Sequence, residues 1–261
     1  MKRVPIFPSV EAFPIPLRPL LQGATLYDSS CSPEAHVIFV DKDGGYYIKS
    51  APKGSLAREA AMGQYFFEKR LGAPVLEYCS LEQDWLLTAR VAGEDCTHPT
   101  YLAEPKRLCD LLAQTLRTLH ETDFEGCPVQ DRTTEYLATV DANYRAGRFD
   151  AAYLPRYLRN LSPKEAWQTV DANRGCLQRN VLLHGDYCLP NILLDGWRFS
   201  GFIDLGQGGV GDRHIDLFWG VWTLEFNLGT DAYADRFLDA YGRDVIRPEL
   251  LSVIGAAECF G

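Results

Sequence analysis

Short runs of β-branched and aromatic residues mark the beginning of the chain. Val37–Val40 and Tyr46–Lys49 are two such runs, and they flank Asp41-Lys42-Asp43-Gly44-Gly45, a sequence typical of a hairpin turn. Val75–Cys79 and Trp85–Ala89 predict two further strands. The pattern therefore predicts a β-sheet in which the first two strands are joined by a tight turn.

One helix-like segment interrupts these strands. It is predicted to open at Ser55 and to end near Gly72, because serine favours a helix start and glycine favours a helix end. Residues 1–25 are rich in proline and leucine and show little period-two or helical pattern. Together these segments predict a small β-rich lobe that contains one long helix.

Helical periodicity dominates the remainder of the chain. Leucines recur at three- and four-residue steps and predict one amphipathic helix: Leu108, Leu111, Leu112, Leu116 and Leu119. We expect helices within 133–175 and over approximately 213–228 and 230–241. The change from strand to helix near residue 90 predicts two lobes, 1–92 and 93–261. The expected fold class is α+β, with a β-rich N-terminal lobe and a larger, mainly helical C-terminal lobe.

Three oxygen-bearing side chains stand close together in the sequence. His184–Asn191 and Phe202–Gly206 contain Asp186, Asn191 five residues later, and Asp204 thirteen residues beyond that. Three flanking apolar runs are predicted to be short buried strands: Val181–Leu183, Ile192–Leu194 and Phe202–Ile203. A hairpin of these strands would hold the three polar groups at one edge. One carboxylate would then accept a hydroxyl proton while the amide and the other carboxylate hold Mg²⁺, which is the arrangement of a phosphoryl-transfer enzyme.

Two upstream residues strengthen this interpretation. Lys49 ends a predicted strand, and Glu59 on the following helix would pair with it, so that an ordered ammonium could meet nucleotide phosphates. Taken alone, a strand lysine is usually a solvent-exposed residue, and a His-Gly-Asp turn can simply close a loop. The presence of all five groups in this order favours a functional site.

Composition narrows the classes of function. The net charge of −9 argues against a nucleic-acid partner and agrees with a cationic substrate. No apolar run approaches the length of a membrane span, and four prolines by position 16 interrupt any signal-peptide core, so we expect a cytoplasmic protein. The eight cysteines form no CxxC pair, so free thiols are expected.

With these residues, the chain resembles the aminoglycoside phosphotransferase family, in particular its 3′-phosphotransferase branch, which has the two-lobed fold of protein kinases. The resemblance is most specific over 183–216. Weaker similarities extend over nearly the whole chain: Ser32-Pro33, Tyr47-Ile48-Lys49, Arg58-Glu59, Leu86-Leu87-Thr88, Leu116-Arg117-Thr118-Leu119-His120, Gly126-Cys127-Pro128 and Ala234-Asp235-Arg236-Phe237. A bilobal, protein-kinase-like fold is therefore expected.

The resemblance implies a role for each residue of the central motif. Asp186 corresponds to the catalytic base, and Asn191 and Asp204 correspond to Mg²⁺ ligands. Lys49 corresponds to the lysine on the nucleotide phosphates, and Glu59 to the glutamate that positions it.

The resemblance also implies a nucleotide pocket, with ATP or GTP as the phosphate donor. Ser32 corresponds to a residue of the loop over the phosphates, and 28–36 contains no glycine, so the glycine-rich loop of protein kinases is absent. The main chain of Ala89 and Val91 would meet the adenine, with Thr88 at the back of the pocket.

Several neighbouring residues are better interpreted as structural. We expect His184 to anchor the loop that carries Asp186, and Asp216 to bond its backbone. His120 is expected to have a capping or core role. Asp212 and Arg213 are expected to form a local ion pair or a feature of a helix start.

The acceptor is the part of the reaction that the resemblance specifies least. Glu165, Glu225, Glu258 and Phe260 are candidates to hold a cationic substrate, although the helix around 222–227 has fewer acids than its relatives. The expected function is phosphorylation of an aminoglycoside hydroxyl, most naturally the 3′ one, by a monomer or weak dimer that confers antibiotic resistance. Two alternatives stay open: a kinase of another small alcohol, such as a choline-like amine, an amino sugar or another antibiotic, and a catalytically idle binding protein.

Overall fold

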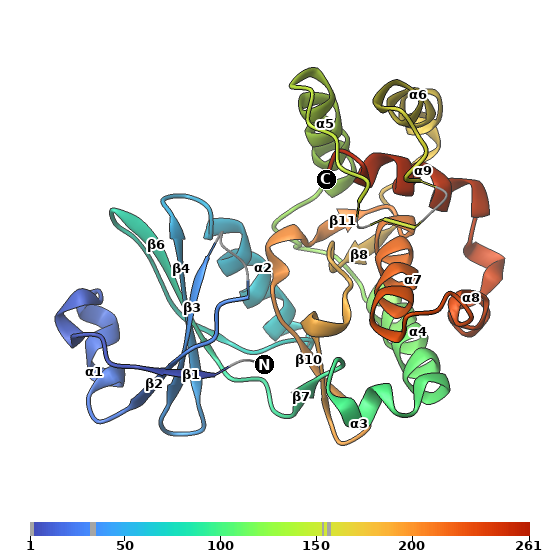
Figure 1. Ribbon diagram of the computed structural model, residues 1–261. Helices are drawn as coiled ribbons and strands as arrows, with labels where there is room; N and C mark the ends of the chain where they lie inside the picture. Colours follow the sequence, from blue (N-terminus) through green and yellow to red (C-terminus); the bar gives the residue numbers. More distant parts are fainter. Residues whose placement is uncertain (1–2, 32–34, 153, 156–157) are drawn as a thin grey trace. The chain divides into compact units, whose positions relative to one another are not determined.

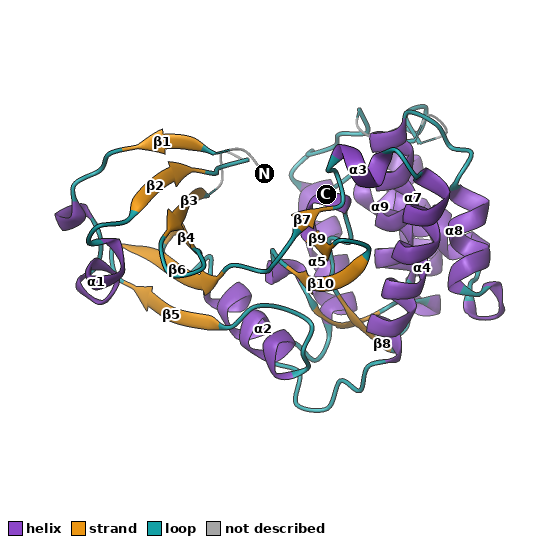
Figure 2. Cartoon of the chain, turned by 90° about the horizontal axis from the view of Figure 1, so that it is seen from below, coloured by secondary structure: helices purple, strands orange, loops and turns teal. Residues whose placement is uncertain are grey.

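The computed structural model describes residues 3–31, 35–152, 154–155 and 158–261 (Figure 1). Its Cα packing divides the chain into two compact units. Unit 1 contains Met1–Asp95 and Asn191–Gly206, and unit 2 contains Cys96–Pro190 and Gln207–Gly261. Strands dominate unit 1 and helices dominate unit 2 (Figure 2), so the expected α+β fold class is confirmed. The predicted functional lobes, 1–92 and 93–261, stay a prediction, because packing assigns 191–206 to unit 1.

Unit 1 is built on a six-stranded antiparallel sheet of order β1-β2-β3-β4-β6-β5. The strands are β1 (Val4–Ile6), β2 (Thr25–Asp28), β3 (His36–Asp41), β4 (Tyr46–Pro52), β5 (Val75–Ser80) and β6 (Gln83–Ala89). The predicted hairpin is confirmed, since β3 pairs with β4 and Val40 lies opposite Tyr46. The first two strands were not predicted from the sequence, because both are short and the first contains Pro5.

Both faces of this sheet are covered by apolar side chains. Leu87 packs in a cluster with Ile48 and Phe13, a residue that follows the first of the short helical turns η1 (Val10–Ala12), η2 (Ile15–Leu17) and α1 (Arg18–Leu21). The next residue toward the N-terminus, Leu86, packs with Ala60 of α2 (Ala57–Glu68) on the opposite face. Because side chains alternate along a strand, Lys49 shares the α2 side of the sheet with Ala51. This alternation directs the lysine toward the helix that carries Glu59.

Helix α2 differs from the prediction at its C-terminal end. It ends at Glu68, before the expected Gly72, because Arg70 adopts a left-handed conformation with φ of 62°. At its other end, the carboxylate of Asp84 on β6 accepts a hydrogen bond from the Leu56 amide at 2.9 Å. The helix start is therefore fixed to the sheet.

A second, smaller sheet completes unit 1. It contains β10 (Arg198–Phe202), β9 (Ile192–Asp195) and β7 (Glu94–Asp95) in that order. Gly93 has φ of 89°, and a Cβ atom there would lie 2.0 Å from the Leu194 carbonyl oxygen. Glycine is therefore required where the chain passes this hairpin.

Unit 2 is a bundle of helices around one apolar core. Its helices are α3 (Pro99–Leu102), α4 (Pro105–Glu121), α5 (Arg132–Arg145), α6 (Pro163–Asn173), α7 (His214–Leu228), α8 (Ala234–Tyr241) and α9 (Pro248–Glu258). The short turns η3 (Arg174–Cys176) and η6 (Arg243–Val245) lie in unit 2, and η4 (Leu189–Asn191) and η5 (Leu205–Gln207) lie where the chain passes from one unit to the other. The leucine periodicity of α4 is confirmed, since Leu108, Leu112, Leu116 and Leu119 are all buried. The last helix, α9, was not predicted; its Ile254 and Ala257 lie in the core cluster.

One expectation about strand pairing is wrong. Strand β8 (Val181–Leu183) does not join β9 and β10 in a single hairpin but pairs with β11 (Gly209–Gly211) in unit 2. The glycines of β11 explain this choice, because a Cβ atom on Gly211 would lie 2.4 Å from a methyl carbon of Leu183. The side chains that follow β8 and those on the β9–β10 hairpin therefore belong to different sheets.

The composition also led to expectations about membrane-spanning helices and about the cysteines. No helix among the described residues is long and apolar enough to cross a membrane. All eight cysteines are free thiols, five of them buried, as expected.

Candidate active site

Lys49 is the centre of a charged cluster in unit 1. Its Nζ donates to the Glu59 carboxylate at 2.7 Å and to the Asp204 carboxylate at 2.9 Å. Burial disfavours the ammonium, but the two carboxylates outweigh this effect and raise the pKa of Lys49. The lysine is therefore charged and held in one orientation, as a group that binds phosphate must be.

Asn191 and Asp204, the two predicted Mg²⁺ ligands, lie in the same unit. The Asn191 side chain is 8% exposed, and its backbone carbonyl accepts from the Ile203 amide at 3.1 Å, one residue before Asp204. Asp204 has φ of 59°, and its side chain is half exposed. An amide and a carboxylate oxygen fit Mg²⁺, which protein sites commonly hold with one or two side chains together with substrate phosphates. The described residues contain no cluster of three or more His, Cys, Asp or Glu side chains that could hold a metal ion.

The predicted nucleotide-pocket residues lie along and beyond the end of β6. Thr88 is paired with Tyr47 of β4 and Val75 of β5. The Ala89 amide already donates to the Pro74 carbonyl at 3.2 Å, so this amide is not available to a base. Val91 follows the strand and is 7% exposed. Ser32 lies outside the described residues.

The loop that carries Asp186 is held by Asp216 of α7 in unit 2. The buried Asp216 carboxylate accepts from the amides of His184 at 2.8 Å and Gly185 at 2.7 Å, which confirms the predicted backbone role. The His184 ring accepts from the Asp186 amide at 3.3 Å, so His184 also anchors the loop. Gly185 has φ of 85°, and a Cβ atom there would lie 1.9 Å from the Gln207 carbonyl oxygen. Only glycine fits this turn.

The ring of His120 contacts the same Asp216 carboxylate. Its Nε2 lies 3.2 Å from Asp216, and its Nδ1 lies 2.8 Å from the Tyr241 hydroxyl. Burial lowers the pKa of His120 in spite of the neighbouring Asp216, so the ring is neutral at pH 7. A neutral ring that donates to Asp216 accepts from Tyr241. The expected core role of His120 is confirmed.

Two further contacts fix the loop, and sequence reasoning missed both. Thr223 of α7 accepts from the Leu189 amide at 3.0 Å, and the Tyr187 hydroxyl donates to the Leu112 carbonyl at 2.8 Å. Neither contact has a local sequence signal, since each joins residues more than thirty positions apart. Asp212, which precedes α7, accepts from the His214 amide and ring, so the expectation of a feature at a helix start is confirmed.

Glu258 is the most strongly perturbed of the predicted substrate residues. Its carboxylate accepts from the Tyr136 hydroxyl at 2.8 Å and from Trp219 Nε1 at 3.2 Å. Burial, helped by the charge of Asp186, raises its pKa to about 7 against the effect of these two hydrogen bonds. A carboxyl group in this environment would gain from a cationic partner.

The other three predicted substrate residues have different surroundings. Glu225 is half-buried on α7. Glu165 is exposed and forms a capping box with Ser162 at the start of α6, so its contacts are those of a helix cap. The Phe260 ring is 2% exposed and packs edge-on against Tyr144 and Phe149, so it belongs to the core. We therefore keep only Glu225 and Glu258 as candidate contacts for an acceptor.

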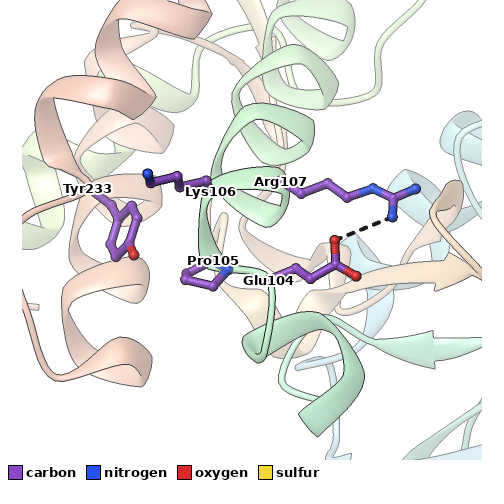
Figure 3. Close-up of a pocket in the computed structure, with 5 residues that line it drawn as sticks. All are labelled: Glu104, Pro105, Lys106, Arg107 and Tyr233. Atoms are coloured by element: carbon purple, nitrogen blue, oxygen red, sulfur yellow. Dashed lines mark hydrogen bonds and ion pairs between the residues drawn. The ribbon is translucent and has the colours of Figure 1, made fainter.

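A surface pocket of unit 2 lies at the start of α4, away from these candidates in the sequence. Glu104, Pro105, Lys106, Arg107 and Tyr233 line it (Figure 3). Arg107 is paired with Glu104 at 3.5 Å across its rim. The pocket contains none of the predicted site residues.

Comparisons with known proteins agree with the chemistry of these groups. Residues 34–251 match the phosphotransferase enzyme family. A protein of Lactococcus lactis subsp. lactis (strain IL1403) called a probable aminoglycoside 3′-phosphotransferase is 49% identical over 97% of each chain. A solved aminoglycoside 3′-phosphotransferase of type VIII has the same fold, with a TM-score of 0.77 over 92% of this chain and 94% of its own, at 24% identity. A Streptomyces rimosus aminoglycoside phosphotransferase in complex with ADP and streptomycin superposes with a TM-score of 0.72 over 86% of this chain and 90% of its own, at 24% identity.

Proposed function

The chain belongs to the phosphotransferase enzyme family, and from this premise we propose that it transfers the γ-phosphate of ATP to the 3′-hydroxyl of an aminoglycoside, in the presence of Mg²⁺. The observation that carries the phosphoryl-transfer part is the Lys49 ammonium bonded to both Glu59 and Asp204. The acceptor follows from relatives called aminoglycoside 3′-phosphotransferases, which match this chain over most of its length.

The nucleotide side of the reaction uses residues of unit 1. Lys49 binds phosphate oxygens, and Glu59 keeps its ammonium in place. Asn191 and Asp204 would hold Mg²⁺, which when bound neutralises charge on the phosphates. In the structure Asp204 is bonded to Lys49, so both groups are ordered before the nucleotide arrives.

The acceptor side uses the loop of unit 2. Asp186 orients the acceptor hydroxyl and accepts its proton as the new P–O bond forms and the bond to the leaving ADP oxygen breaks. The carboxylate of Asp216 and the ring of His184 fix the loop backbone up to the Asp186 amide, and Thr223 bonds the Leu189 amide beyond it, so the base does not have to be positioned during the reaction.

The acidic character of the chain supports a cationic acceptor. Glu258 is a carboxyl group whose burial disfavours its charge, and an ammonium group beside it would restore that charge. The net charge of −9 would also raise the local concentration of a polycation. We propose that the enzyme acts in the cytoplasm, where ATP is available, and that expression confers aminoglycoside resistance.

A change of the base tests the proposal. Asp186→Ala should abolish most turnover of kanamycin, while the nucleotide-induced shift in the unfolding temperature stays within error of the wild type, because the nucleotide residues are untouched. Asp195→Ala, at the exposed last residue of β9, is the matched control and should retain full turnover. Full turnover by the Asp186 variant would contradict the assigned mechanism.

The acceptor class needs its own measurement. Phosphorylation assays with kanamycin, neomycin, choline and simple sugars compare the proposed acceptor with the other small alcohols. Turnover of choline or a simple sugar, with none of either aminoglycoside, would identify a kinase of another small molecule. Absence of an Mg-ATP-induced thermal shift would instead identify a catalytically idle binding protein.

A further inference from the structure

Two residues of unit 2 that are far apart in the sequence are joined by a pair of hydrogen bonds. Arg132 Nε donates to the backbone carbonyl of Gln207 at 3.0 Å, and Arg132 Nη2 donates to the side-chain oxygen of Gln207 at 2.5 Å. A guanidinium presents its N–H groups in a rigid planar fork, so two bonds to one residue define the positions of both partners. We call this pair the Arg132–Gln207 clamp.

The arginine side of the clamp is fixed by α5. The guanidinium carbon of Arg132 lies 5.9 Å from the centre of the Tyr136 ring, which is buried. Arg132 is also the first residue of the helix, and the preceding Asp131 caps the helix by accepting from the Thr134 amide at 3.0 Å. Both the backbone and the guanidinium of Arg132 are therefore held in place.

The position of Arg132 in α5 is unfavourable for a cation. The positive end of the helix dipole lies at the N-terminus, where an acid is stabilised and an arginine is not. Glu135 in the same turn agrees with this rule, whereas Arg132 departs from it. A residue that departs from a local rule is expected to serve a contact elsewhere in the fold, and for Arg132 that contact is Gln207.

The carbonyl group that accepts from Arg132 also lies against the turn before the proposed base. A Cβ atom on Gly185 would lie 1.9 Å from the Gln207 carbonyl oxygen and 2.8 Å from the Gln207 Cβ atom, so the Gly185 backbone is in direct contact with Gln207. Asp186 is the next residue in the sequence. The clamp therefore fixes the surface against which the turn before Asp186 packs.

The chain that follows Gln207 is attached to the segment before α5 as well. The Val210 amide donates to the Val129 carbonyl at 2.8 Å. A Cβ atom on Gly209 would lie 3.1 Å from the Cβ atom of Arg132, so the two backbones approach closely. Gln207 is thus placed by its own two hydrogen bonds and by the residues that follow it.

We propose that Arg132 is a positioning residue for Asp186. Through Gln207 it restricts the movement of the Gly185 turn, and so keeps the carboxylate of Asp186 where it can accept the proton of the acceptor hydroxyl. This inference rests on the proposed function. Asp216 bonds the amides of the same loop, whereas the clamp limits the space into which the Gly185 turn can move. Such restriction matters because a misplacement of about 1 Å can lower the rate about a hundredfold.

Graded changes of the two partners test this inference. Arg132→Gln removes the guanidinium and both bonds, so we expect kcat with kanamycin to fall about tenfold while the KM values for ATP and kanamycin stay within about twofold. Gln207→Ala keeps the backbone carbonyl and should lower kcat only about threefold. Gln207→Glu keeps an acceptor oxygen for the guanidinium and should retain kcat within about twofold.

A direct readout of the loop separates positioning from a general loss of stability. Amide hydrogen exchange over 183–190 should be faster in Arg132→Gln than in the wild type and should be unchanged in Gln207→Glu. The control is Arg145→Gln, which removes the same charge from the exposed last residue of the same helix. This control should retain the wild-type kcat and the wild-type exchange of the loop.

Three results would overturn the inference. They are an unchanged kcat in Arg132→Gln, a lower kcat without faster exchange over 183–190, and a higher KM for kanamycin with an unchanged kcat. The last of these would assign the guanidinium to the acceptor instead of the loop. If the wild type phosphorylates no aminoglycoside, the proposed function fails, whereas faster exchange in Arg132→Gln would still show that the clamp fixes this loop.

Discussion

At the scale of single residues, Glu258 is a buried carboxyl group that is unfavourable for folding and suited to binding a cation. The groups that face it are Tyr136 and Arg132 from α5, Trp219 from α7, and the charge of Asp186. Burial dominates and raises the pKa of Glu258 to about 7. The burial of this carboxyl group lowers the stability of the folded protein, and the same group would gain from binding a cation.

The stability of the protein should therefore depend on this carboxyl group. Between pH 4.5 and about 7 the folded state binds the Glu258 proton more tightly than the unfolded state, so stability falls as pH rises through this range. Glu258→Gln should remove about 2 kcal/mol of this decrease, which urea unfolding at pH 5 and pH 8 measures. Glu249→Gln, in the exposed first turn of α9, is the control. A variant as pH-dependent as the wild type would show that Glu258 is not the group responsible.

Asp216 is a positioning residue for the loop that carries Asp186. Asp216→Asn replaces one acceptor oxygen by a donor, so the amide of His184 or Gly185 loses its partner. We expect kcat to fall by at least about tenfold with little change in the KM for ATP, since hydrogen bonds to charged groups contribute roughly 1.5 to 3 kcal/mol.

A second aspartate near the start of α7 distinguishes positioning from general stability. Asp212 is also buried and bonds Gln178 and His214, but it has no hydrogen bond to the Asp186 loop among those described. Asp212→Asn should lower the unfolding temperature and retain most of kcat. Equal losses of kcat in the two variants would argue that Asp216 acts only through stability.

At the scale of elements, helix α2 is attached to the sheet at its start. Burial alone would raise the pKa of Asp84, but hydrogen bonds led by the Gly54 amide, with others from Ser80, Leu56 and Tyr78, lower it to about 2. Since α2 carries Glu59, this anchor also fixes the group that orients Lys49.

The anchor predicts a stability contribution with a defined pH range. It is fully present above pH 4, the ordinary range of an aspartate, and is lost as pH falls toward 2. Asp84→Asn should therefore lower stability by about 2 kcal/mol at pH 7 and by much less near pH 2.5, in thermal or urea unfolding. Tyr78→Phe removes one donor only and should cost less than half as much. An equal cost at both pH values would exclude the carboxylate as the cause.

The sequence predicted the elements whose patterns are local. The β3–β4 hairpin, α2, α4 and α7 were predicted because each carries its own periodicity or turn residues. Strands β1 and β2 gain their stability from pairing at the sheet edge, which a three- or four-residue pattern cannot reveal. The partner of β8 was predicted wrongly because the choice depends on space beside Gly211, a property of the folded chain.

The same distinction holds for the candidate site. The pairing of Lys49 with Glu59 could be predicted, since both stand on adjacent elements. The contacts of Glu258 with Tyr136 and Trp219 join three helices and have no local signal. Glu165 was assigned to a substrate by charge alone, although its spacing from Ser162 is that of a capping box.

At the scale of the whole molecule, the two units would contribute different parts of the proposed reaction. Unit 1 contains Lys49 and the proposed Mg²⁺ ligands, and unit 2 contains the fixed loop of Asp186 together with Glu258. The chemistry of phosphoryl transfer requires both sets of groups, because the protein mainly positions the reactants and stabilises charge. The acidic chain as a whole favours a cationic acceptor.

The most direct test of the central claim compares two acceptors that differ by one oxygen atom. Kanamycin B and its 3′-deoxy counterpart have the same charges and rings, so both should bind. With ATP and Mg²⁺, ³¹P NMR should detect a single phosphate ester at the 3′ position of kanamycin B and none on the 3′-deoxy compound. Comparable phosphorylation of both compounds would contradict the claim that this enzyme acts on the 3′-hydroxyl.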